Sequence, residues 1–413
     1  MLQWPRFEVL GISRRDFALV FTLLFNAFTW SYMTVMIIES IPLSSTVRSS
    51  FSAVFYIAAS GAGLSGALLS EKIRRLRFLY FWIILGIIGS SLLIFINVIT
   101  VAHLSIIFIL LGISFGLGMP LSLAHFADNS AIENRALISS LILLAANLCT
   151  FPIAISIMAF NPVVNAVFLT IWRVVGLVVF ILLKPKDVHH SDKKKYVSFV
   201  SVFRNRSFFL YLLPWVMFCL IDALEKALLL NVISSDLQRL MLTVEPIVGV
   251  LFIFIAGLLT DRIGRKKMAI YGFVSLGIGY AIVSLAPMIT EAWYFYFVID
   301  GIAWGILSTI FILTLWGDLS PHGAREKYYA VASFPLGTRS AIPVLLTTVI
   351  ASIPPNAAFS LASFFLFLSV IPLMYAPETL PEKKMELRRL KGYVEQAKKV
   401  RDKHLRKSDV AES

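Results

Sequence analysis

The sequence GALLSEKIRRLR at residues 66–77 returns 190 positions later as AGLLTDRIGRKK at residues 256–267. Four positions are identical, and the polar substitutions keep acid opposite acid and base opposite base. A second pair of segments, GISFG at 112–116 and GIAWG at 301–305, keeps the offset within one residue. Solenoid repeats have periods of roughly 20–50 residues, so each copy must belong to a half-molecule with several elements. The sequence therefore predicts an internal duplication.

The composition indicates that both halves lie in a membrane. Hydrophobic residues make up 58% of the chain, charged residues 15%, and the mean hydropathy is +0.83, whereas soluble domains carry roughly 25% charged residues. Long apolar runs recur, each near the roughly 20 residues that a helix needs to cross the hydrocarbon. We predict an all-α membrane protein with twelve transmembrane helices, six in each half: 17–40, 49–70, 78–98, 101–124, 137–159, 163–183, 207–230, 240–260, 268–287, 292–316, 328–350 and 357–377.

These spans divide the chain into four parts. An N-terminal six-helix bundle is expected at residues 1–183 and a C-terminal six-helix bundle at 207–377. A cytoplasmic linker at 184–206 joins the bundles, and a basic cytoplasmic tail follows at 378–413.

The lysines and arginines predict the orientation, because cytoplasmic loops carry an excess of both. They lie in the N-terminal segment, in loops 71–77, 125–136, 184–206, 261–267 and 317–327, and in the tail, with five exceptions: Arg48, Arg173, Lys226, Arg239 and Arg339. Both termini are therefore expected in the cytoplasm, in a multi-pass protein of the cell membrane. The net charge of +13 follows from this topology. It does not indicate a nucleic-acid partner, since no basic groove or aromatic platform accompanies it.

The duplicated loop also resembles a family signature. AGLLTDRIGRKK closely resembles the signature between helices 2 and 3 of the major facilitator superfamily, and the resemblance covers residues 10–380. It implies the major facilitator fold of two six-helix pseudo-repeats. GDLSPHGAR at 317–325 and APETL at 376–380 are similar to loops of sugar-porter-like members. The chain departs from those members after helix 6, where it reads KPKDV, and it lacks their arginine in helix 4. The resemblance thus favours the sugar and metabolite branch in general.

Charged residues at the two copies of the loop are expected to form a cytoplasmic gate. An acid at a helix end can face the positive N-terminus of another helix, while Arg265 or Arg75 can pair with Asp318 or Asp128. The resemblance implies that such residues stabilise the outward-facing form and separate when the halves rock; alternatively, the basic residues only set the topology. The expected gate residues are Glu71, Arg75, Asp128, Arg135, Asp261, Gly264, Arg265, Asp318 and Arg325. The second copy keeps the family's aspartate and turn glycine, so it is expected to hold more strongly than the first.

Charges inside the expected spans are candidates for substrate and proton sites, because each costs at least about 2.5–3.5 kcal/mol at a helix centre unless paired or hydrated. Asp300 and Arg339 fall near the midpoints of helices 10 and 11. They form either a protonatable acid and an anion-binding base at a central cavity or a structural salt bridge between two helices.

A second group of charges is expected toward the extracellular side. Asp222, Glu225 and Lys226 share one arc of helix 7. The lysine can neutralise one of the acids, which leaves the other as a proton site. Glu245 on helix 8 is expected to join them in an extracellular gate.

The resemblance also implies which helices line the cavity. Helices 1, 4, 7 and 10 do so most directly in the family, and helices 5, 8 and 11 complete it. This makes Asn26, Asn147, Trp30 and Trp304 candidates for polar or stacking contacts with the substrate, with ordinary packing as the alternative. Arg173 lies in the middle of helix 6, a peripheral helix in the family, and the sequence assigns it no role.

These features predict a secondary active transporter of a small organic solute, a sugar or an organic acid, working by alternating access. Proton-coupled symport is expected because several carboxylates lie in or beside the spans, with the proton as coupling ion and no metal or cofactor. Proton-driven efflux of amphipathic compounds and a non-transporting sensor or scaffold are the alternatives. An enzyme is not expected, since no nucleophile–base constellation, HExxH motif or phosphate loop is present. We expect a monomer whose partners are its solute and the lipid bilayer.

Overall fold

The first half of the chain is a bundle of long helices. The structure is a computed structural model that describes residues 11–96, 100–185, 197–345, 353–381 and 390. Its first-half helices are α1 (Arg14–Ser40), α2 (Ser45–Leu69), α3 (Arg75–Leu92) with a 3₁₀ turn at Leu93–Phe95, α4 (Val101–Asn129), α5 (Arg135–Leu148), α6 (Thr150–Ala159) and α7 (Pro162–Leu182). Polar side chains cap several of them; Ser13, for example, accepts a hydrogen bond from the Asp16 amide at the start of α1.

The second half repeats this pattern. It begins with the short α8 (Phe199–Arg204) and continues with α9 (Arg206–Val232), α10 (Ser235–Ile263), α11 (Arg265–Leu285), α12 (Thr290–Ser308), α13 (Leu315–Leu319), α14 (Arg325–Thr338), α15 (Ile342–Leu345), α17 (Pro355–Leu368) and α18 (Val370–Tyr375). A π-helical segment at Thr309–Thr314 joins α12 to α13, and a 3₁₀ turn at Arg339–Ala341 joins α14 to α15. Every regular element in the described residues is helical.

The predicted membrane class is confirmed. Eleven helical segments in the described part of the chain are long and apolar enough to cross a membrane. The eleventh expected span, 328–350, is the one not among them; it is represented by α14 and α15, and its last residues lie outside the described ranges. Several helices exceed the predicted spans: α4 runs on to Asn129 and α10 begins at Ser235. Hydropathy detects only the part of a helix that lies in hydrocarbon, whereas the helix continues through the polar interface.

Prolines explain two interruptions within the passes. Pro152 cannot donate a hydrogen bond to the carbonyl of Leu148, and the fifth pass divides there into α5 and α6. Pro343 likewise leaves the carbonyl of Arg339 without its helical donor, and the chain forms the 3₁₀ turn at that residue. The side chain of Arg339 is thus set at a break in the eleventh pass.

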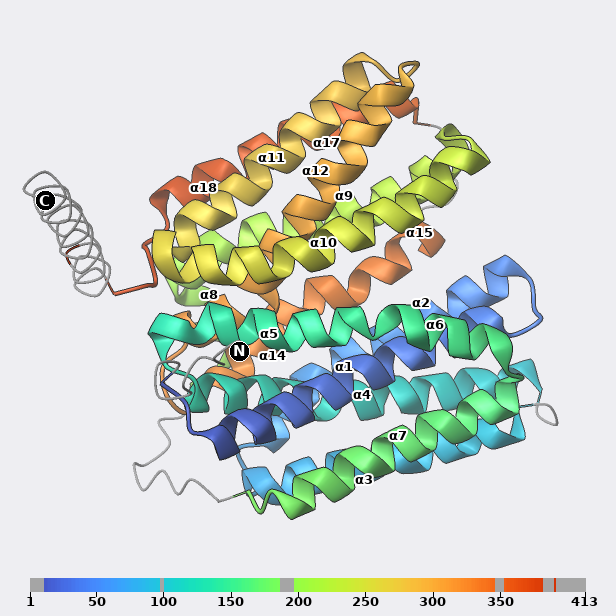
Figure 1. Ribbon diagram of the computed structural model, residues 1–413. Helices are drawn as coiled ribbons and strands as arrows, with labels where there is room; N and C mark the ends of the chain where they lie inside the picture. Colours follow the sequence, from blue (N-terminus) through green and yellow to red (C-terminus); the bar gives the residue numbers. More distant parts are fainter. Residues whose placement is uncertain (1–10, 97–99, 186–196, 346–352, 382–389, 391–413) are drawn as a thin grey trace, which may run out of the picture.

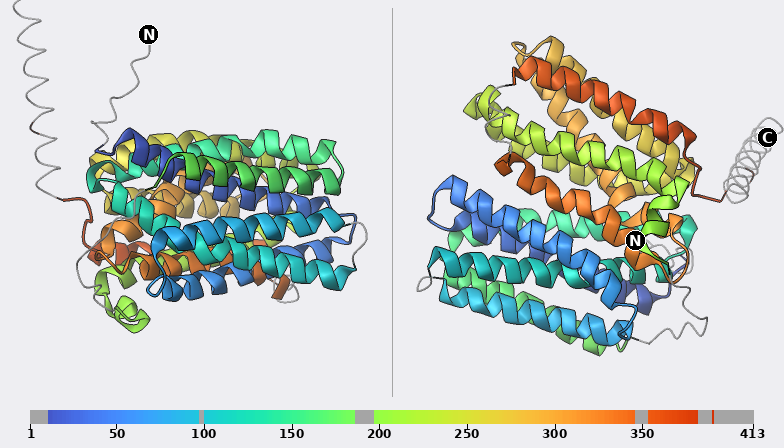
Figure 2. Two further views of the ribbon diagram at one scale, coloured as in Figure 1. Left: turned by 90° about the horizontal axis from the view of Figure 1, so that it is seen from below. Right: turned by 180° about the vertical axis from the view of Figure 1, so that it is seen from behind.

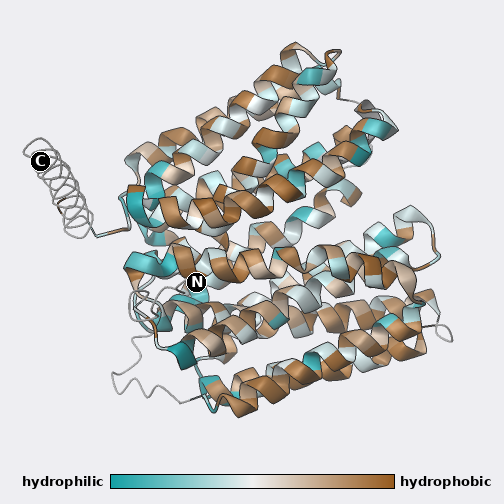
Figure 3. Ribbon diagram, viewed as in Figure 1, coloured by the Kyte–Doolittle hydropathy of each residue, from teal (hydrophilic) through white to brown (hydrophobic). Residues whose placement is uncertain are grey.

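The helices form two bundles that lie side by side (Figure 1). The ribbons of the two bundles converge at the end where α5 and α14 begin, and they diverge toward the end where α1 joins α2; the view from behind agrees (Figure 2). Across the boundary, α5 packs against α10, while α2 and α4 pack against α14. Polar residues gather at both ends of the bundles, and apolar residues cover the middle (Figure 3).

Glycines permit the closest helix approach in the first bundle. A Cβ placed on Gly66 of α2 would lie 1.9 Å from the Leu117 carbonyl oxygen of α4, and one on Gly116 of α4 would lie 1.8 Å from the Ala59 carbonyl oxygen of α2. Helices in lipid gain stability from such backbone packing, because burial of apolar surface drives little association there. The α2–α4 pair is therefore closely packed where it meets α14 of the second bundle.

Candidate functional site

Asp318 occupies a buried ion-pair site at the converging end of the bundles. Its Oδ2 lies 3.0 Å from Nε of Arg265, which belongs to the same half, and its Oδ1 lies 2.5 Å from Nη1 of Arg135 in the first half. The side chains of Asp318 and Arg265 are 0% exposed and that of Arg135 is 2% exposed. Arg135 also donates hydrogen bonds to the carbonyls of Ala127 and Ser130. The arginine that joins the two halves therefore has several hydrogen-bond partners.

Asp128 occupies the corresponding position in the first half. Its Oδ2 lies 2.5 Å from Nη1 of Arg75, from its own half, and its Oδ1 accepts a hydrogen bond from Arg325 of the other half. Arg75 also pairs with Glu326 at 2.5 Å, and its side chain is 24% exposed. The two aspartates therefore follow one rule, because each holds the loop arginine of its own half and the first residue of a helix from the other half. We call these two aspartates and four arginines the charged network.

The acids of the duplicated loop meet helix N-termini of the opposite half. Asp261 accepts hydrogen bonds from the backbone amides of Ala136 (3.3 Å) and Leu137 (2.8 Å) in the first turn of α5, where the helix dipole favours negative charge. Glu71 lies 2.6 Å from Nζ of Lys327 in the first turn of α14. The second copy is the more buried, since the Asp261 side chain is 6% exposed and that of Glu71 is 29% exposed.

Glu378 is a residue of this end that the sequence reasoning missed. Its two carboxylate oxygens accept hydrogen bonds from the amides of Arg265 (2.9 Å) and Lys266 (3.1 Å) and so cap α11. Gly264, with φ of +114°, leaves room for it, because a Cβ there would lie 2.3 Å from Glu378 Oε2. The APETL motif contained this residue, but only the folded chain brings it to the second loop.

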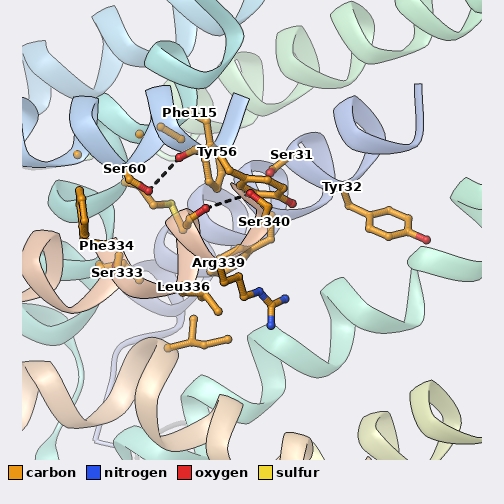
Figure 4. A pocket seen from close by; sticks show the side chains of 18 of the residues that line it. Ser31, Tyr32, Tyr56, Ser60, Phe115, Ser333, Phe334, Leu336, Arg339 and Ser340 are labelled. Atoms are coloured by element: carbon orange, nitrogen blue, oxygen red, sulfur yellow. Dashed lines mark hydrogen bonds between the residues drawn. The ribbon is translucent and has the colours of Figure 1, made fainter. Parts of the chain in front are cut away.

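A cavity of about 520 Å³ lies between the two bundles. It is lined by α1, α2, α4 and α5 from the first half and by α9, α12, α14 and the turn at Arg339 from the second. Most of the lining is apolar or aromatic. Figure 4 shows Tyr56, Ser31 and Ser340 gathered on one side, with the Arg339 side chain extending away from them. Of the lining residues that the structure describes, only Asp222 and Arg339 carry charge.

Arg339 forms an ion pair with Asp222 in the wall of this cavity, where Nη1 of the arginine lies 2.5 Å from Oδ2 of the aspartate. The Arg339 side chain is 26% exposed and that of Asp222 is 3% exposed, so the arginine presents more of its surface to the cavity than the acid does. The guanidinium carbon lies 4.8 Å from the ring centroid of Trp304, a stacking distance at which an arginine keeps its edge available for hydrogen bonds. The Asp300–Arg339 salt bridge considered from the sequence is replaced by this pair.

Three further acids lie behind the wall; we call Glu225, Glu245 and Asp300 the acidic cluster. Glu225 accepts a hydrogen bond from the Tyr280 hydroxyl (2.6 Å) and another from Tyr296. Asp300 is 2% exposed and lies close to Glu245. Two neighbouring carboxylates repel each other, so a proton on one of them is favourable. The arrangement can therefore store a proton.

Of the remaining candidate site residues, some line the cavity and others pack between helices. Asn147 and Trp304 line the cavity, whereas the acidic cluster does not. Asn26 was expected at the cavity, but it is buried between α1 and α7, where it accepts a hydrogen bond from Arg173 (2.8 Å) and donates to the Trp172 carbonyl. The side chain of Lys226 lies outside the described part of the structure.

The same contacts explain how Arg173 is accommodated in the first bundle. Its guanidinium lies 4.4 Å from the ring centroid of Trp82 and 5.2 Å from that of Trp30, and Trp30 donates to Ser90 (2.8 Å). A buried cation between two indole faces and an amide oxygen is stabilised without a carboxylate. Trp30 therefore belongs to the packing of the first bundle.

Comparisons with known proteins agree with this architecture. The family model described as Major Facilitator Superfamily matches residues 196–410. No curated protein matches the sequence. The fold is similar to the human organic anion transporter MFSD10 (TETRAN), with TM-score 0.64 and 16% identity over 87% of this chain and 99% of that one. It is also similar to the proton:xylose symporter XylE (0.66, 16%, 88% and 96%) and to the transporter FucP in its outward conformation (0.70, 11%, 88% and 100%).

Proposed function

We propose that this chain, which belongs to the Major Facilitator Superfamily, is a secondary active transporter that takes up a small organic solute together with protons. Family and fold support a multi-pass membrane transporter. The cavity between the bundles is the candidate solute site, since about 520 Å³ lies within the roughly 300–1,000 Å³ of small-molecule sites. Proteins of similar fold include an organic anion transporter and a proton:xylose symporter, so organic anions and sugars are the first solutes to test.

The geometry supports an outward-facing state for the conformation described. The charged network holds the bundles together at the end that the lysine and arginine pattern predicts to be cytoplasmic, and the bundles diverge at the other end (Figure 1). We propose that the charged network, with Glu71, Asp261 and Gly264, is the gate that opens in the opposite state. The residues are buried enough for their release to control the equilibrium between the two states.

The acidic cluster is the main support for proton coupling. Asp300 and Glu225 have no cationic partner among the described residues, and Asp300 lies close to Glu245. Charges without a cationic partner are costly at this depth, so Asp300 and Glu225 favour bound protons. Glu225 lies one helical turn from Asp222 on α9, which connects the cluster to the cavity wall.

Uptake into proteoliposomes tests the proposal. Purified protein is given a library of labelled sugars and organic acids, with and without an inward proton gradient. We expect at least one solute to accumulate above its external concentration, and a protonophore to abolish that accumulation. Asp300→Asn should retain exchange of solute at equilibrium but lose accumulation. Asp236→Asn, which alters an exposed pair with Arg239, serves as the control.

The other outcomes identify the rival functions. Solute movement against the direction of the proton gradient would indicate efflux. No flux with any solute, together with intact folding, would favour a sensor or scaffold. Accumulation that is unchanged in Asp300→Asn would remove the acidic cluster from the proton path.

A further inference from the structure

We propose that the first bundle holds a small monovalent anion such as chloride, bound between α3, α4 and α7 by the side chains of Arg173 and Ser114. This site lies apart from the cavity and the charged network, and it goes beyond the proposed transport function. The proposal derives from one edge of a buried guanidinium and one buried hydroxyl group, which lie around the same point beside Gly86.

The guanidinium of Arg173 has only part of its surface occupied by protein groups. Arg173 is 1% exposed, its guanidinium lies close to the rings of Trp82 and Trp30, and its Nη1 donates to Asn26. Its Nε and Nη2 are also buried, but neither of them has a hydrogen-bond partner within the described part of the chain. A guanidinium carries five N–H donors in one plane. The edge that holds Nε and Nη2 therefore keeps its donors for a ligand.

The hydroxyl group of Ser114 on α4 is in the same position. Ser114 is 0% exposed, and its Oγ has no hydrogen-bond partner among the described residues. Ser122 on the same helix is equally buried, but its hydroxyl donates to the Gly118 carbonyl one turn earlier (2.9 Å). A buried hydroxyl without a partner is costly, so Ser114 is a second donor that a ligand would satisfy.

Gly86 of α3 leaves the space between these two groups. A Cβ built on Gly86 would lie 2.7 Å from Nε of Arg173 and 3.4 Å from Oγ of Ser114. The two polar atoms are therefore at most 6.1 Å apart, the sum of these distances. One bridging ligand covers such a span with two hydrogen bonds of roughly 3 Å each.

Charge and hydrogen-bond chemistry select an anion for this place. Arg173 carries its positive charge inside a transmembrane helix, and no acidic side chain of the described residues pairs with it. Charges at this depth are costly unless they are paired. The N–H groups of Arg173 and the hydroxyl of Ser114 all donate, and a halide accepts several hydrogen bonds without donating any. Because both residues are at most 1% exposed, the ligand must be a small ion.

The bound anion would support the first-half wall of the cavity. Trp82 donates a hydrogen bond to the Phe115 carbonyl (3.2 Å), and the rings of Trp30 and Phe115 stack with their centroids 6.3 Å apart. Phe115 lines the cavity. An anion that fixes Arg173 beside both indole rings therefore stabilises the helices that carry this part of the lining.

Bound halide is measured on the full-length protein, which is purified in sodium bromide and then transferred to sodium gluconate at the same ionic strength. Elemental mass spectrometry counts the bromide that stays with the protein, and a buried ion leaves slowly because it must await a local opening. We expect stoichiometric bromide in the wild type. In nanodiscs, the melting temperature should rise with chloride or bromide concentration but not with gluconate, because a ligand of the folded state stabilises that state.

Three variants distinguish the proposed site from a general effect of salt. Arg173→Met replaces the charge with an apolar side chain, so it should retain no bromide and should melt alike in halide and gluconate. Ser114→Ala removes one donor, so about tenfold more halide should be needed for the same rise in melting temperature. Ser122→Ala should respond to halide as the wild type does, since its hydroxyl has a carbonyl partner.

None of these measurements requires transport, so they test the site whatever becomes of the proposed function. Equal melting in halide and gluconate together with no retained bromide would assign the place beside Gly86 to water and overturn the proposal. A halide response that persists in Arg173→Met would overturn it as well. If Arg173→Met gives no folded protein, Ser114→Ala decides: an unchanged halide response refutes the site, whereas a weakened one with a normal response in Ser122→Ala supports it.

Discussion

Asp318→Asn is the substitution that tests the gate most directly. The carboxylate holds Arg265 at 3.0 Å and Arg135 at 2.5 Å, and all three side chains are at most 2% exposed. An asparagine keeps the shape but supplies one acceptor oxygen and a donor NH₂ group that repels a guanidinium. Removing one partner of a buried ion pair typically costs about 3–5 kcal/mol, because the remaining charge is left uncompensated.

That cost falls on the closed arrangement of the charged network. When the bundles separate at this end, Arg135 exchanges its carboxylate for water, so the substitution destabilises the separated state less. We therefore expect the equilibrium to shift toward separation by roughly 10²- to 10³-fold. The bundles should then spend much of their time apart at the end that is closed in Figure 1.

The assay measures the distance between two spin labels by double electron–electron resonance. Nitroxide labels at exposed Lys72 and Lys267, one in each half, report the separation after Cys149 and Cys219 are replaced by serine. The longer-distance population should rise strongly in Asp318→Asn and remain unchanged in Asp236→Asn, whose pair with Arg239 is 79–87% exposed. An unchanged distance distribution in a folded Asp318→Asn protein would refute the idea that the charged network controls the equilibrium.

Three other substitutions give distinct outcomes. Gly264→Ala must adopt φ of +114° and meet Glu378, so we expect a loss of roughly 2–3 kcal/mol, visible as a lower melting temperature. Asn26→Ala removes the acceptor from Arg173 and should cost about 1–3 kcal/mol while solute affinity stays constant; reduced affinity at unchanged stability would place Asn26 in the solute site instead. Gly116→Val should prevent folding because its side chain would overlap the Ala59 backbone of α2, whereas Gly61→Val, with open space around it, should give normal yields.

The membrane architecture followed from sequence because the bilayer allows few solutions. A backbone in hydrocarbon must satisfy its own hydrogen bonds, so apolar runs of about 20 residues become helices with little dependence on their neighbours. The breaks at Pro152 and Pro343 are equally local. Helix ends were less predictable, as α10 shows by starting at Ser235, because hydropathy does not register the polar turns beyond the hydrocarbon.

The partners of charged side chains depend on contacts that no local pattern contains. Arg339 could be placed in the membrane from sequence, but its choice of Asp222 over Asp300 depends on how α9, α12 and α14 pack. The hydrogen bond between Asn26 and Arg173 likewise required α1 to meet α7. Glu378 is remote from Gly264 in sequence, although the two touch in space. Periodicity identifies which residues are costly to bury, and only the fold shows how the cost is offset.

The pairing rule of the charged network explains how a buried gate can open reversibly. Each aspartate binds an arginine of its own half, Arg75 or Arg265, as well as the crossing arginine, Arg325 or Arg135. When the halves separate, each aspartate keeps the partner that moves with it, and only the crossing arginine exchanges its carboxylate for water. Opening therefore leaves no isolated buried acid. The two crossings still differ in cost, because the side chains of Arg135 and Asp318 are 2% and 0% exposed whereas those of Arg325 and Asp128 are 6% and 9% exposed. The crossing at Asp318 has more desolvated charge to rehydrate, so we infer that it sets the barrier to opening.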